Sequence, residues 1–329
     1  MSIDGRTLAK AKAKLEEKRS LREVVYRKRL EQAYETVPKL RGLDVQIRQT
    51  MTDLVGLALG VNVGQNIEEI RELNLDLQEQ RYLELKKAGF SEDFLDESYM
   101  CRKCNDTGYV DSKMCTCLSD LYKDELRQSL SSLLKLGDET FDSFDLNYYD
   151  ATPSADTGIP ARRVMEIIYE TCVEYARKFG KSSMNLFFNG APGLGKTFLS
   201  ACIARVVAEK GYSVVYEMAG ALFSRFEDAK FGRTDDTDTA RQEIKRYMEC
   251  DLLILDDLGT EMTTVFIISA LYELINTRLI TGKKTIISSN LTTDELKRKY
   301  SEQIMSRLEG EYQVLTFRGS DIRQKKNVL

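Results

Sequence analysis

The chain has 329 residues, of which 42% are hydrophobic and 30% charged, and its formal net charge is −4. This composition is typical of a soluble globular protein with room for about two domains. The sequence contains no histidine, which excludes Ser-His-Asp and Cys-His catalysis and any metal site that mixes cysteine with histidine. No apolar run approaches the roughly 18 residues that span a bilayer, and the N-terminus lacks a signal-like apolar core, so we expect a cytoplasmic protein.

The first part of the chain is predicted to be helical and highly charged. Residues 6–36 contain few glycines or prolines and indicate one long helix, and residues 43–58 and 65–88 indicate two amphipathic helices. Residues 1–48 hold 13 Lys/Arg against 7 Asp/Glu, an excess of 6 positive charges. Because a helix this polar gains little from its own burial, we predict that residues 1–96 form a helical domain that contacts a partner. A helical spacer without a specific partner is the alternative.

A cluster of four cysteines follows this helical region. They occur as two close pairs, with a glycine in the loop between them, and they are Cys101, Cys104, Cys115 and Cys117. Four thiolates complete a tetrahedral set for structural zinc, so residues 97–136 are predicted to be a zinc knuckle and a following helix. A pair of disulfides is the alternative, which a cytosolic location disfavours. The other three cysteines lie in apolar contexts and are predicted to be buried.

A phosphate-binding loop dominates the second half of the chain. Residues 137–160 are rich in turn formers and are predicted to link the first part to a second domain, residues 161–329. There, an apolar strand-like run precedes a glycine loop and a helix-like run, which together comprise Gly190, Ala191, Pro192, Gly193, Leu194, Gly195, Lys196, Thr197 and Phe198. In this context the loop N–H groups and the helix N-terminus face an anion. Lys196 is predicted to reach the β- and γ-phosphates, and the Thr197 hydroxyl to bind Mg²⁺.

Two further strand tips carry polar side chains. The run DLLILDD delivers Asp256 and Asp257, and the run KTIISSN delivers Asn290. Asp256 is predicted to hold Mg²⁺ and Asp257 to polarise the attacking water, although the usual residue there is Glu, which leaves Glu261 as the alternative base. Asn290 is predicted to bind the γ-phosphate or the water. Since strands alternate with helices, we predict an α/β fold with a parallel sheet and helices on both faces.

Five segments in this order carry a family resemblance: GAPGLGKT, DLLILDDLGTE, TIISSNL, IMSRLEG and FRGSDIR. They resemble the AAA+ ATPases of the DnaC/DnaI helicase-loader group, which also includes the IstB transposition helpers, over about residues 140–329. The cysteine knuckle is similar to the zinc-bearing N-terminal region of DnaI-type loaders, which favours a loader over an IstB protein. The resemblance implies an AAA+ domain without a full lid, and only 12 residues follow the last predicted strand.

The same resemblance implies roles for arginines. Arg307 occupies the arginine-finger position, which in this family reaches the γ-phosphate bound by a neighbouring subunit, and Arg323 matches the second-sensor position. A finger supplied in trans makes hydrolysis depend on assembly. Arg278 is a weaker candidate to face a neighbour. The alternative for Arg307 and Arg323 is a surface ion pair with a nearby acid.

The implied function is an ATP-dependent loader. Its N-terminal domain is expected to bind the replicative DNA helicase, to place it on single-stranded DNA, and to use slow, assembly-dependent ATP hydrolysis for release. A candidate surface for the single strand combines aromatic and basic residues, although core packing is the alternative for them: Phe223, Arg225, Phe226, Lys230, Phe231 and Arg233. The competing functions are an IstB-like transposition helper and a nucleotide-gated scaffold with little hydrolysis.

Overall fold

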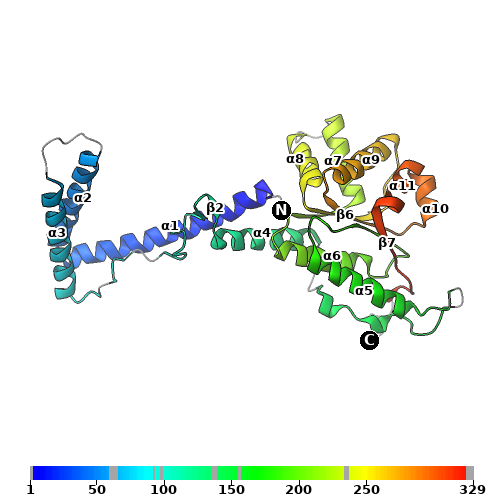
Figure 1. Cartoon of the computed structure of the whole chain (residues 1–329), viewed down its shortest axis with the longest axis horizontal. Coiled ribbons are helices and arrows are strands. Elements are labelled where there is room, and N and C mark those ends of the chain that lie inside the picture. Colours follow the sequence, from blue (N-terminus) through cyan, green and yellow to red (C-terminus); the bar gives the residue numbers. More distant parts are fainter. Residues whose placement is uncertain are drawn as a thin grey trace. The chain divides into compact units, whose positions relative to one another are not determined.

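The computed structural model describes residues 3–58, 66–91, 93–96, 99–134, 139–154, 157–232 and 237–323 (Figure 1). Packing divides the chain into two compact units, residues 12–117 and residues 1–11 together with 118–329. The predicted boundaries at residues 96, 136 and 160 stay predictions. Over the described ranges, none of the helices combines the length and apolarity needed to cross a membrane.

Three helices make up most of residues 12–117. They are α1 (Gly5–Thr36), which begins in the other unit, α2 (Lys39–Ala58) and α3 (Ile67–Lys87). The Asn66 side chain caps α3 by accepting from the Glu68 N–H, and Gly89 follows the helix with a φ of 82°, a conformation that commonly ends helices. A small core joins the end of α1 to α2 and α3 through Ala33, Val37, Leu40, Leu85 and Leu95. The three predicted helices are therefore confirmed.

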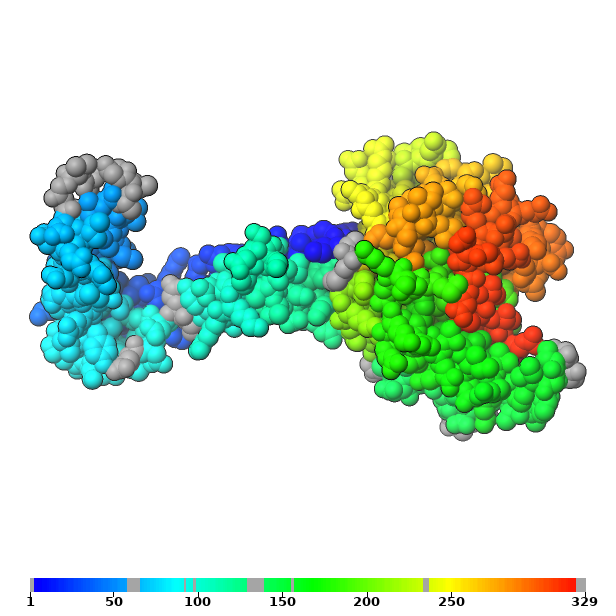
Figure 2. All heavy atoms as spheres, viewed as in Figure 1, coloured from blue at the N-terminus to red at the C-terminus, as the bar shows by residue number. Residues whose placement is uncertain are grey.

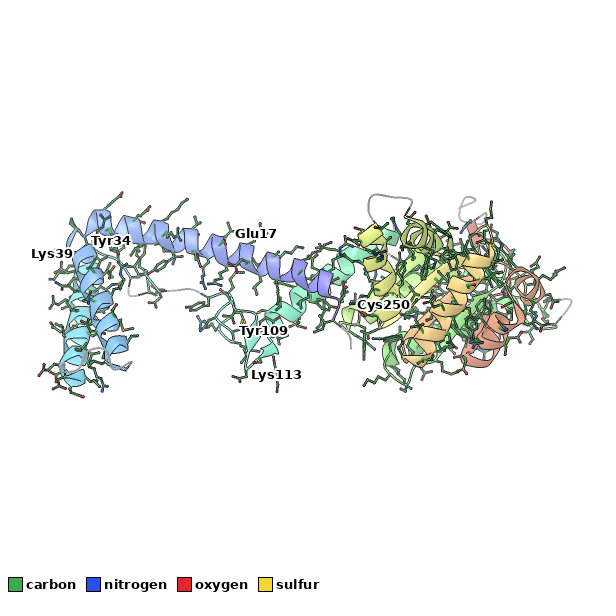
Figure 3. All side chains as sticks on the ribbon, turned by 90° about the horizontal axis from the view of Figure 1, so that it is seen from above. Glu17, Tyr34, Lys39, Tyr109, Lys113 and Cys250 are labelled. Carbon is green, nitrogen blue, oxygen red and sulfur yellow. The ribbon has the colours of Figure 1, made fainter. Side chains whose placement is uncertain are left out.

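A short hairpin lies between the two cysteine pairs. Strand β1 (Tyr109–Val110) pairs antiparallel with β2 (Lys113–Met114), and Tyr109 and Lys113 mark the two strands in Figure 3. The turn residues Asp111 and Ser112 both have positive φ, 47° and 64°, which is typical of the tight turns that join two-residue hairpins. This hairpin brings the second cysteine pair back toward the first.

A five-stranded parallel sheet organises the second unit, in the order β4-β5-β6-β3-β7. The strands are β3 (Asn185–Asn189), β4 (Val214–Met218), β5 (Leu252–Leu258), β6 (Lys284–Ser289) and β7 (Tyr312–Thr316). The helices are α4 (Thr116–Leu134), α5 (Ala161–Lys178), α6 (Lys196–Glu209), α7 (Ala219–Phe231), α8 (Thr237–Glu249), α9 (Val265–Ile280), α10 (Thr293–Lys299) and α11 (Glu302–Glu311). The predicted alternation of strands and helices and the parallel sheet are confirmed.

Helices cover both faces of this sheet, because successive strand residues point to opposite sides. On one face Phe187, Val215, Leu253 and Ile287 join the core formed with α7, α9 and α11. Helices α5 and α6 lie on the other face, as Figure 1 shows. The carboxyl ends of β5, β6 and β3, three adjacent strands, therefore meet along one edge.

Arg278 is buried inside this unit, so the suggestion that it faces a neighbouring subunit is wrong. Its side chain is 0% exposed and donates to the carbonyls of Tyr247 (2.6 Å), Cys250 (3.1 Å) and Lys284 (2.5 Å) and to the Thr285 hydroxyl. The guanidinium thus ties the end of α8 to the start of β6.

The proposed aromatic surface for single-stranded DNA is largely core. Phe223 and Phe226 of α7 are only 1% and 7% exposed, and both belong to the main core. Phe231 is exposed and packs against Phe266, with ring centroids 5.2 Å apart. Arg233 lies outside the described residues. The core alternative therefore holds for Phe223 and Phe226.

Candidate nucleotide-binding site

The glycine loop between β3 and α6 is tightly enclosed. Gly190 and Gly193 have φ angles of 146° and 75°, which disfavour other residues. A Cβ on Gly190 would lie 2.6 Å from the Phe317 carbonyl oxygen, and one on Gly193 would lie 1.9 Å from the Asp321 carboxylate. Gly190 therefore requires glycine for backbone conformation and for space, and Gly193 requires it mainly for backbone conformation. The helix α6 begins directly after the loop, so its first N–H groups are available to an anion.

Lys196 is held at the centre of the strand edge. The residue is 5% exposed, and its Nζ donates to the carbonyls of Gly190 (2.5 Å) and Ala191 (2.8 Å) and to Asn290 Oδ1 (2.7 Å). Burial lowers the pKa of Lys196, while the nearby aspartates act in the opposite direction. A buried ammonium beside a glycine loop is well placed to neutralise a phosphate.

Asp256 is almost completely buried and accepts from three hydroxyl groups. Thr197 Oγ1 donates to its Oδ2 over 2.9 Å, and the Tyr216 and Ser288 hydroxyls donate to Oδ2 and Oδ1. The structure thus brings together the two predicted magnesium ligands, Thr197 and Asp256. A hydroxyl and a carboxylate are oxygen donors of the kind that Mg²⁺ prefers, so the pair fits the ion.

Asp257 and Asn290 form the rest of the cluster. Asp257 has a φ of 55° and lies within a register shift of β5, between Leu255 and Leu258, so its carboxylate is turned differently from that of its neighbour. Asn290 Nδ2 donates to Asp257 Oδ1 over 3.0 Å, and the same amide accepts from Lys196. Burial, and then the charge of Asp256, raise the pKa of Asp257. The Asn290 amide thus connects the Lys196 ammonium to the Asp257 carboxylate.

Glu261 is engaged elsewhere. Its Oε2 accepts from the Gly259 N–H over 3.0 Å, and its Oε1 accepts from the Tyr300 hydroxyl. Lys299 donates to the main-chain carbonyls of Gly259 (2.5 Å) and Glu261 (3.0 Å), so Lys299 and Tyr300 together hold the loop after β5 against α10. None of the contacts of the described residues joins Glu261 to Lys196, whereas Asp257 is connected to Lys196 through Asn290.

Residues 140–149, predicted only as part of a linker, pack against the glycine loop. Tyr149 is 2% exposed and its hydroxyl donates to the Leu194 carbonyl over 2.9 Å. The Phe144 ring lies 5.6 Å from the Phe198 ring and 5.8 Å from the Tyr149 ring. The aromatic density of this segment was a signal that sequence reasoning did not use.

A hollow of about 640 Å³ opens beside the loop. Its lining comes from residues 150–154, from Ile159 and Ala161, from Ala191 and Leu194 of the loop, and from residues 316–320. Figure 2 shows the C-terminal segment, in red, lying against the green segments that include this lining. Its size fits the base and sugar of a nucleotide.

The two predicted arginines differ in their surroundings. The Arg307 guanidinium lies 4.4 Å from the centre of the Tyr272 ring and donates to its hydroxyl over 2.7 Å, so α11 holds it against α9. Within the described ranges Arg307 has no ion pair and no contact with the glycine loop; Glu309 pairs with Lys297 instead. Arg323 directly follows Ile322, whose N–H donates to the Gly193 carbonyl over 3.1 Å, so this segment lies beside the glycine loop.

The four cysteines of the knuckle converge in the other unit. Their Sγ atoms all lie within 4.8 Å of one another, with 3.7 Å between Cys101 and Cys115 and 3.4 Å between Cys104 and Cys117. A tetrahedral zinc site with Zn–S bonds of about 2.3 Å separates its sulfurs by about 3.8 Å, whereas a disulfide needs about 2.05 Å. All four thiols are free, so the disulfide alternative is not formed and the donor set fits zinc.

Hydrogen bonds around the cysteines support this arrangement. The Cys117 N–H lowers the pKa of the Cys115 thiol, which favours its thiolate, whereas burial raises the pKa of the Cys117 thiol. Asp106 is 4% exposed and accepts from the Cys101 N–H (2.8 Å) and from Arg22 (2.8 Å). Asp106 therefore fixes the first cysteine and ties the knuckle to α1. The three remaining cysteines, Cys172, Cys202 and Cys250, are buried as predicted.

A glycine loop, an acidic strand tip and a polar strand tip on adjacent strands of a five-stranded parallel sheet define a P-loop ATP-binding domain of the AAA+ type. Residues 132–328 match the family described as IstB-like ATP binding protein. The chain belongs to this family.

Several relatives carry names that describe their roles. The replicative helicase loader DnaC of Buchnera aphidicola is 26% identical over 153 residues, which is 46% of this chain and 61% of that protein. The loader DnaI of Bacillus subtilis is 28% identical over 156 residues, 44% of this chain and 45% of that protein. An ATP-binding protein of an insertion sequence from Mycobacterium tuberculosis is 33% identical over 106 residues, which is 32% of this chain and 40% of that protein. The chain thus spans between 40% and 61% of the length of these relatives.

Two solved structures are also similar to part of the chain. The crystal structure of the DnaC helicase loader aligns with a TM-score of 0.45 and 19% identity, and covers 55% of this chain and 97% of that one. The crystal structure of DnaI aligns with a TM-score of 0.45 and 21% identity, and the alignment covers 60% of this chain and 99% of that one.

Proposed function

We propose that this protein is an ATP-dependent helper that binds a replicative DNA helicase and assists its placement on single-stranded DNA. The observation that carries the proposal is the connected cluster of Lys196, Asn290 and Asp257 beside the Thr197–Asp256 pair. It lies in a member of the IstB-like ATP binding family, and two of the relatives described above are named replicative helicase loaders.

Each residue of the cluster has a proposed task in ATP hydrolysis. Lys196 and the loop N–H groups bind the phosphates, and Asn290 orients the γ-phosphate or the attacking water. Thr197 and Asp256 hold Mg²⁺, which neutralises the charge that develops on the phosphate oxygens. Asp257 accepts the proton of the water. Arg323 approaches the same phosphates, and Phe198, which packs against Phe144, supports the start of α6 beside the loop.

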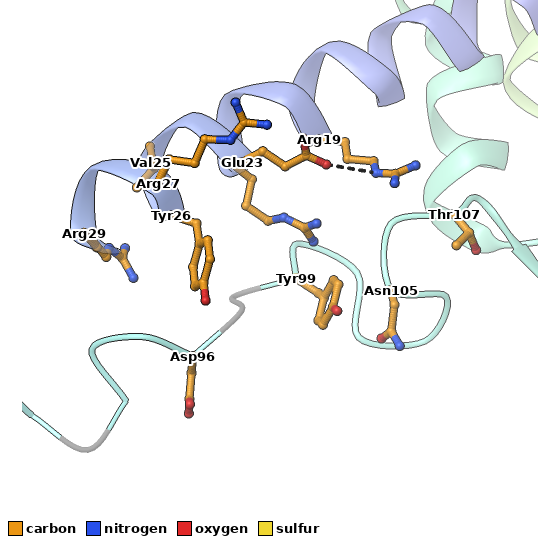
Figure 4. A pocket seen from close by; sticks show the side chains of 11 residues that line it. Arg19, Glu23, Val25, Tyr26, Arg27, Arg29, Asp96, Tyr99, Asn105 and Thr107 are labelled. Atoms are coloured by element: carbon orange, nitrogen blue, oxygen red, sulfur yellow. Dashed lines mark ion pairs between the residues drawn. The ribbon is translucent and has the colours of Figure 1, made fainter. Parts of the chain in front are cut away.

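Residues 12–117 supply candidate surfaces for the partner. Large apolar side chains are exposed on α2 and α3, including Met51, Val55, Ile67, Leu73 and Leu75. A hollow of about 520 Å³ between α1 and the knuckle loop is lined by arginines and tyrosines (Figure 4). Exposed apolar and basic surfaces of this kind support a partner-binding role over that of a helical spacer.

An IstB-like transposition helper is the second candidate. The 33% identity to the insertion-sequence protein favours it. The cysteine cluster favours the loader, because it resembles the zinc-bearing region of DnaI-type proteins. The third candidate is a nucleotide-gated scaffold. It is favoured by Asp257, because this side chain is shorter than the Glu that usually polarises the attacking water and would suit slow hydrolysis.

Capture of the replicative helicase by the full chain tests the loader proposal. The chain is immobilised and exposed to the helicase of the same host, with ATP or without nucleotide, before and after treatment with a zinc chelator. We expect capture that the chelator weakens. ATP hydrolysis is then measured with single-stranded DNA, duplex DNA and helicase, with Lys196→Ala as the inactive control.

The outcomes separate the candidate functions. Absence of helicase capture in the zinc-loaded sample overturns the loader proposal and leaves an ATPase. Stimulation by duplex but not by single-stranded DNA favours the transposition helper. Magnesium-dependent ATP binding without turnover under any condition favours the scaffold.

A further inference from the structure

We propose that Tyr216 is a positioning residue for magnesium, because its buried hydroxyl fixes the carboxylate of Asp256. The inference deepens the proposed function and rests on it. Tyr216 lies on β4, is 5% exposed, and donates its hydroxyl proton to Asp256 Oδ2. Neither the loop motif nor the acidic motif includes this residue.

The strand register explains why a β4 side chain reaches Asp256. Strand β4 pairs in parallel with β5, and Tyr216 is the partner of Ile254, two residues before Asp256. Because the side-chain period of a strand is two residues, Tyr216, Ile254 and Asp256 face the same side of the sheet. The length of the phenol then spans the remaining distance along the strand.

Ser288 holds the same carboxylate from the other side. It lies on β6, the opposite neighbour of β5, and donates its hydroxyl proton to Asp256 Oδ1. Its oxygen also accepts from the Asp257 N–H over 3.0 Å. Both carboxylate oxygens are thus fixed by hydroxyls from the strands on either side of β5.

The third donor, Thr197, has a different role. Its hydroxyl is the proposed magnesium ligand of the loop, so its bond to Asp256 is replaced when the ion binds. The Tyr216 and Ser288 hydroxyls are not proposed ligands and stay on the carboxylate. Neutral donors orient a carboxylate without cancelling its charge, and loss of such a partner typically weakens metal binding by about 10- to 100-fold.

Tyr216→Phe in the full chain tests this inference. The substitution keeps the buried ring and removes the hydroxyl. Binding of a fluorescent, non-hydrolysable ATP analogue is measured without metal and during a Mg²⁺ titration, together with the thermal unfolding midpoint. We expect the Mg²⁺ concentration at the midpoint to rise about tenfold. The metal-free affinity should match that of the unmodified chain, and the variant should stay folded, with an unfolding midpoint lower by only a few degrees because one buried hydrogen bond is lost.

Tyr247→Phe is the matched control. Tyr247 is also buried, at 1% exposure, and also donates to a carboxylate, Glu217 Oε2 at 3.3 Å, but it has no contact with Asp256. Its Mg²⁺ midpoint should not change. Should Tyr216→Phe fail to fold, Ser288→Ala removes the other donor, and the same rise is expected.

The contrary results are distinct. An unchanged Mg²⁺ midpoint in Tyr216→Phe overturns the positioning role, and so does an equal loss of affinity with and without metal, which indicates packing alone. If the unmodified chain binds no nucleotide, or binds it without any response to Mg²⁺, the proposed function fails instead.

Discussion

Asp256 and Asp257 are adjacent in the sequence but have different surroundings. Asp256 accepts from three hydroxyls and is 1% exposed, whereas Asp257 accepts from the Asn290 amide and is only partly buried. Two carboxylates whose environments differ in this way are suited to different tasks. The geometry supports metal binding by the first and proton transfer by the second.

The raised pKa of Asp257 leads to a prediction about pH. A base must be ionised, so hydrolysis should fall as pH decreases through this raised pKa, at a higher pH than for an ordinary aspartate. Asp257→Asn should lower kcat by about 10²- to 10⁴-fold and retain nucleotide binding. A pH–rate profile of both proteins checks this. An acidic limb that persists in Asp257→Asn would contradict the assignment.

The same pKa shift affects stability with a definite sign. Because the folded state binds the Asp257 proton more tightly than the unfolded chain does, ionisation of this group lowers the free energy of unfolding as pH rises from the ordinary aspartate pKa through the raised one. Asp257→Asn removes this contribution. Urea unfolding across that window should therefore show a smaller loss of stability in the variant.

Gly193→Ala should weaken nucleotide binding. The new methyl group would have to occupy space taken by the Asp321 carboxylate, 1.9 Å away, at a φ of 75°. We expect affinity for the fluorescent ATP analogue to fall by more than about tenfold, since the strain and the displacement together cost on the order of 2 kcal/mol. Gly220→Ala, in α7 with open space around it, is the control and should bind normally. Equal affinity in both variants would show that the loop tolerates the methyl group.

At the level of secondary-structure elements, Arg278 connects α8 to β6. Arg278→Met leaves several buried carbonyls without a donor, among them those of Tyr247 and Lys284. We expect a loss of about 3 kcal/mol in the free energy of unfolding and a thermal midpoint lower by roughly 6–12 °C. Arg241→Met removes only an exposed pair with Asp238 and should change stability by less than about 0.5 kcal/mol. A melting curve of Arg278→Met that matches this control would contradict the structural role.

The knuckle should bind one zinc ion per chain. Cys104→Ser removes one of four thiolates and should abolish stoichiometric zinc, whereas Lys103→Ala, its exposed neighbour, should retain it. Zinc content by elemental analysis and the absorption of the cobalt-substituted protein measure the outcome. ATP binding should be unchanged, because the glycine loop lies in the other compact unit. Full zinc retention in Cys104→Ser would exclude the four-cysteine site.

The periodicity of the sequence predicted the helices and strands better than it predicted the tertiary contacts between them. The long helices and the buried strands were predictable because apolar spacing reports which face is buried. The two-residue strands β1 and β2 and the short helix α10 were not predicted, since such short elements carry little periodic signal. The packing of Phe144 and Tyr149 against the glycine loop depends on tertiary contacts that spacing does not encode.

The same limit applies to the site. Lys196, Asp256 and Asn290 were predictable because parallel strands bring their carboxyl ends to one edge. The contribution of Tyr216 could not be predicted from the sequence. It depends on which strand lies beside β5, and the spacing of apolar residues does not specify the order of strands in the sheet. The burial of Arg278 was likewise hidden, because its acceptors are carbonyls from two distant elements.

For the whole molecule, the arginine-finger proposal predicts complementation between subunits. Arg307 has its contacts on α9, away from its own glycine loop in the described part of the chain, so any role in hydrolysis would concern a neighbour's nucleotide. Arg307→Ala and Lys196→Ala should each lose activity, and a mixture of the two should recover part of it. Arg298→Ala, at an exposed position on α10, serves as the control. A mixture that stays as inactive as its components would contradict a finger supplied in trans.

Successive side chains of β6 lie on opposite faces of the sheet, so the number of residues in this strand determines which side chain meets which surroundings. Ile287 points into the main core, Ser288 points at Asp256, and Asn290 follows directly at the tip. Inserting or deleting one residue would move each side chain to the opposite face of the sheet. The Ser288 hydroxyl would then lie in the hydrophobic core, and the Ile287 side chain would lie beside Asp256. The spacing between Ile287, Ser288 and Asn290 therefore has to be kept for each side chain to reach its own surroundings.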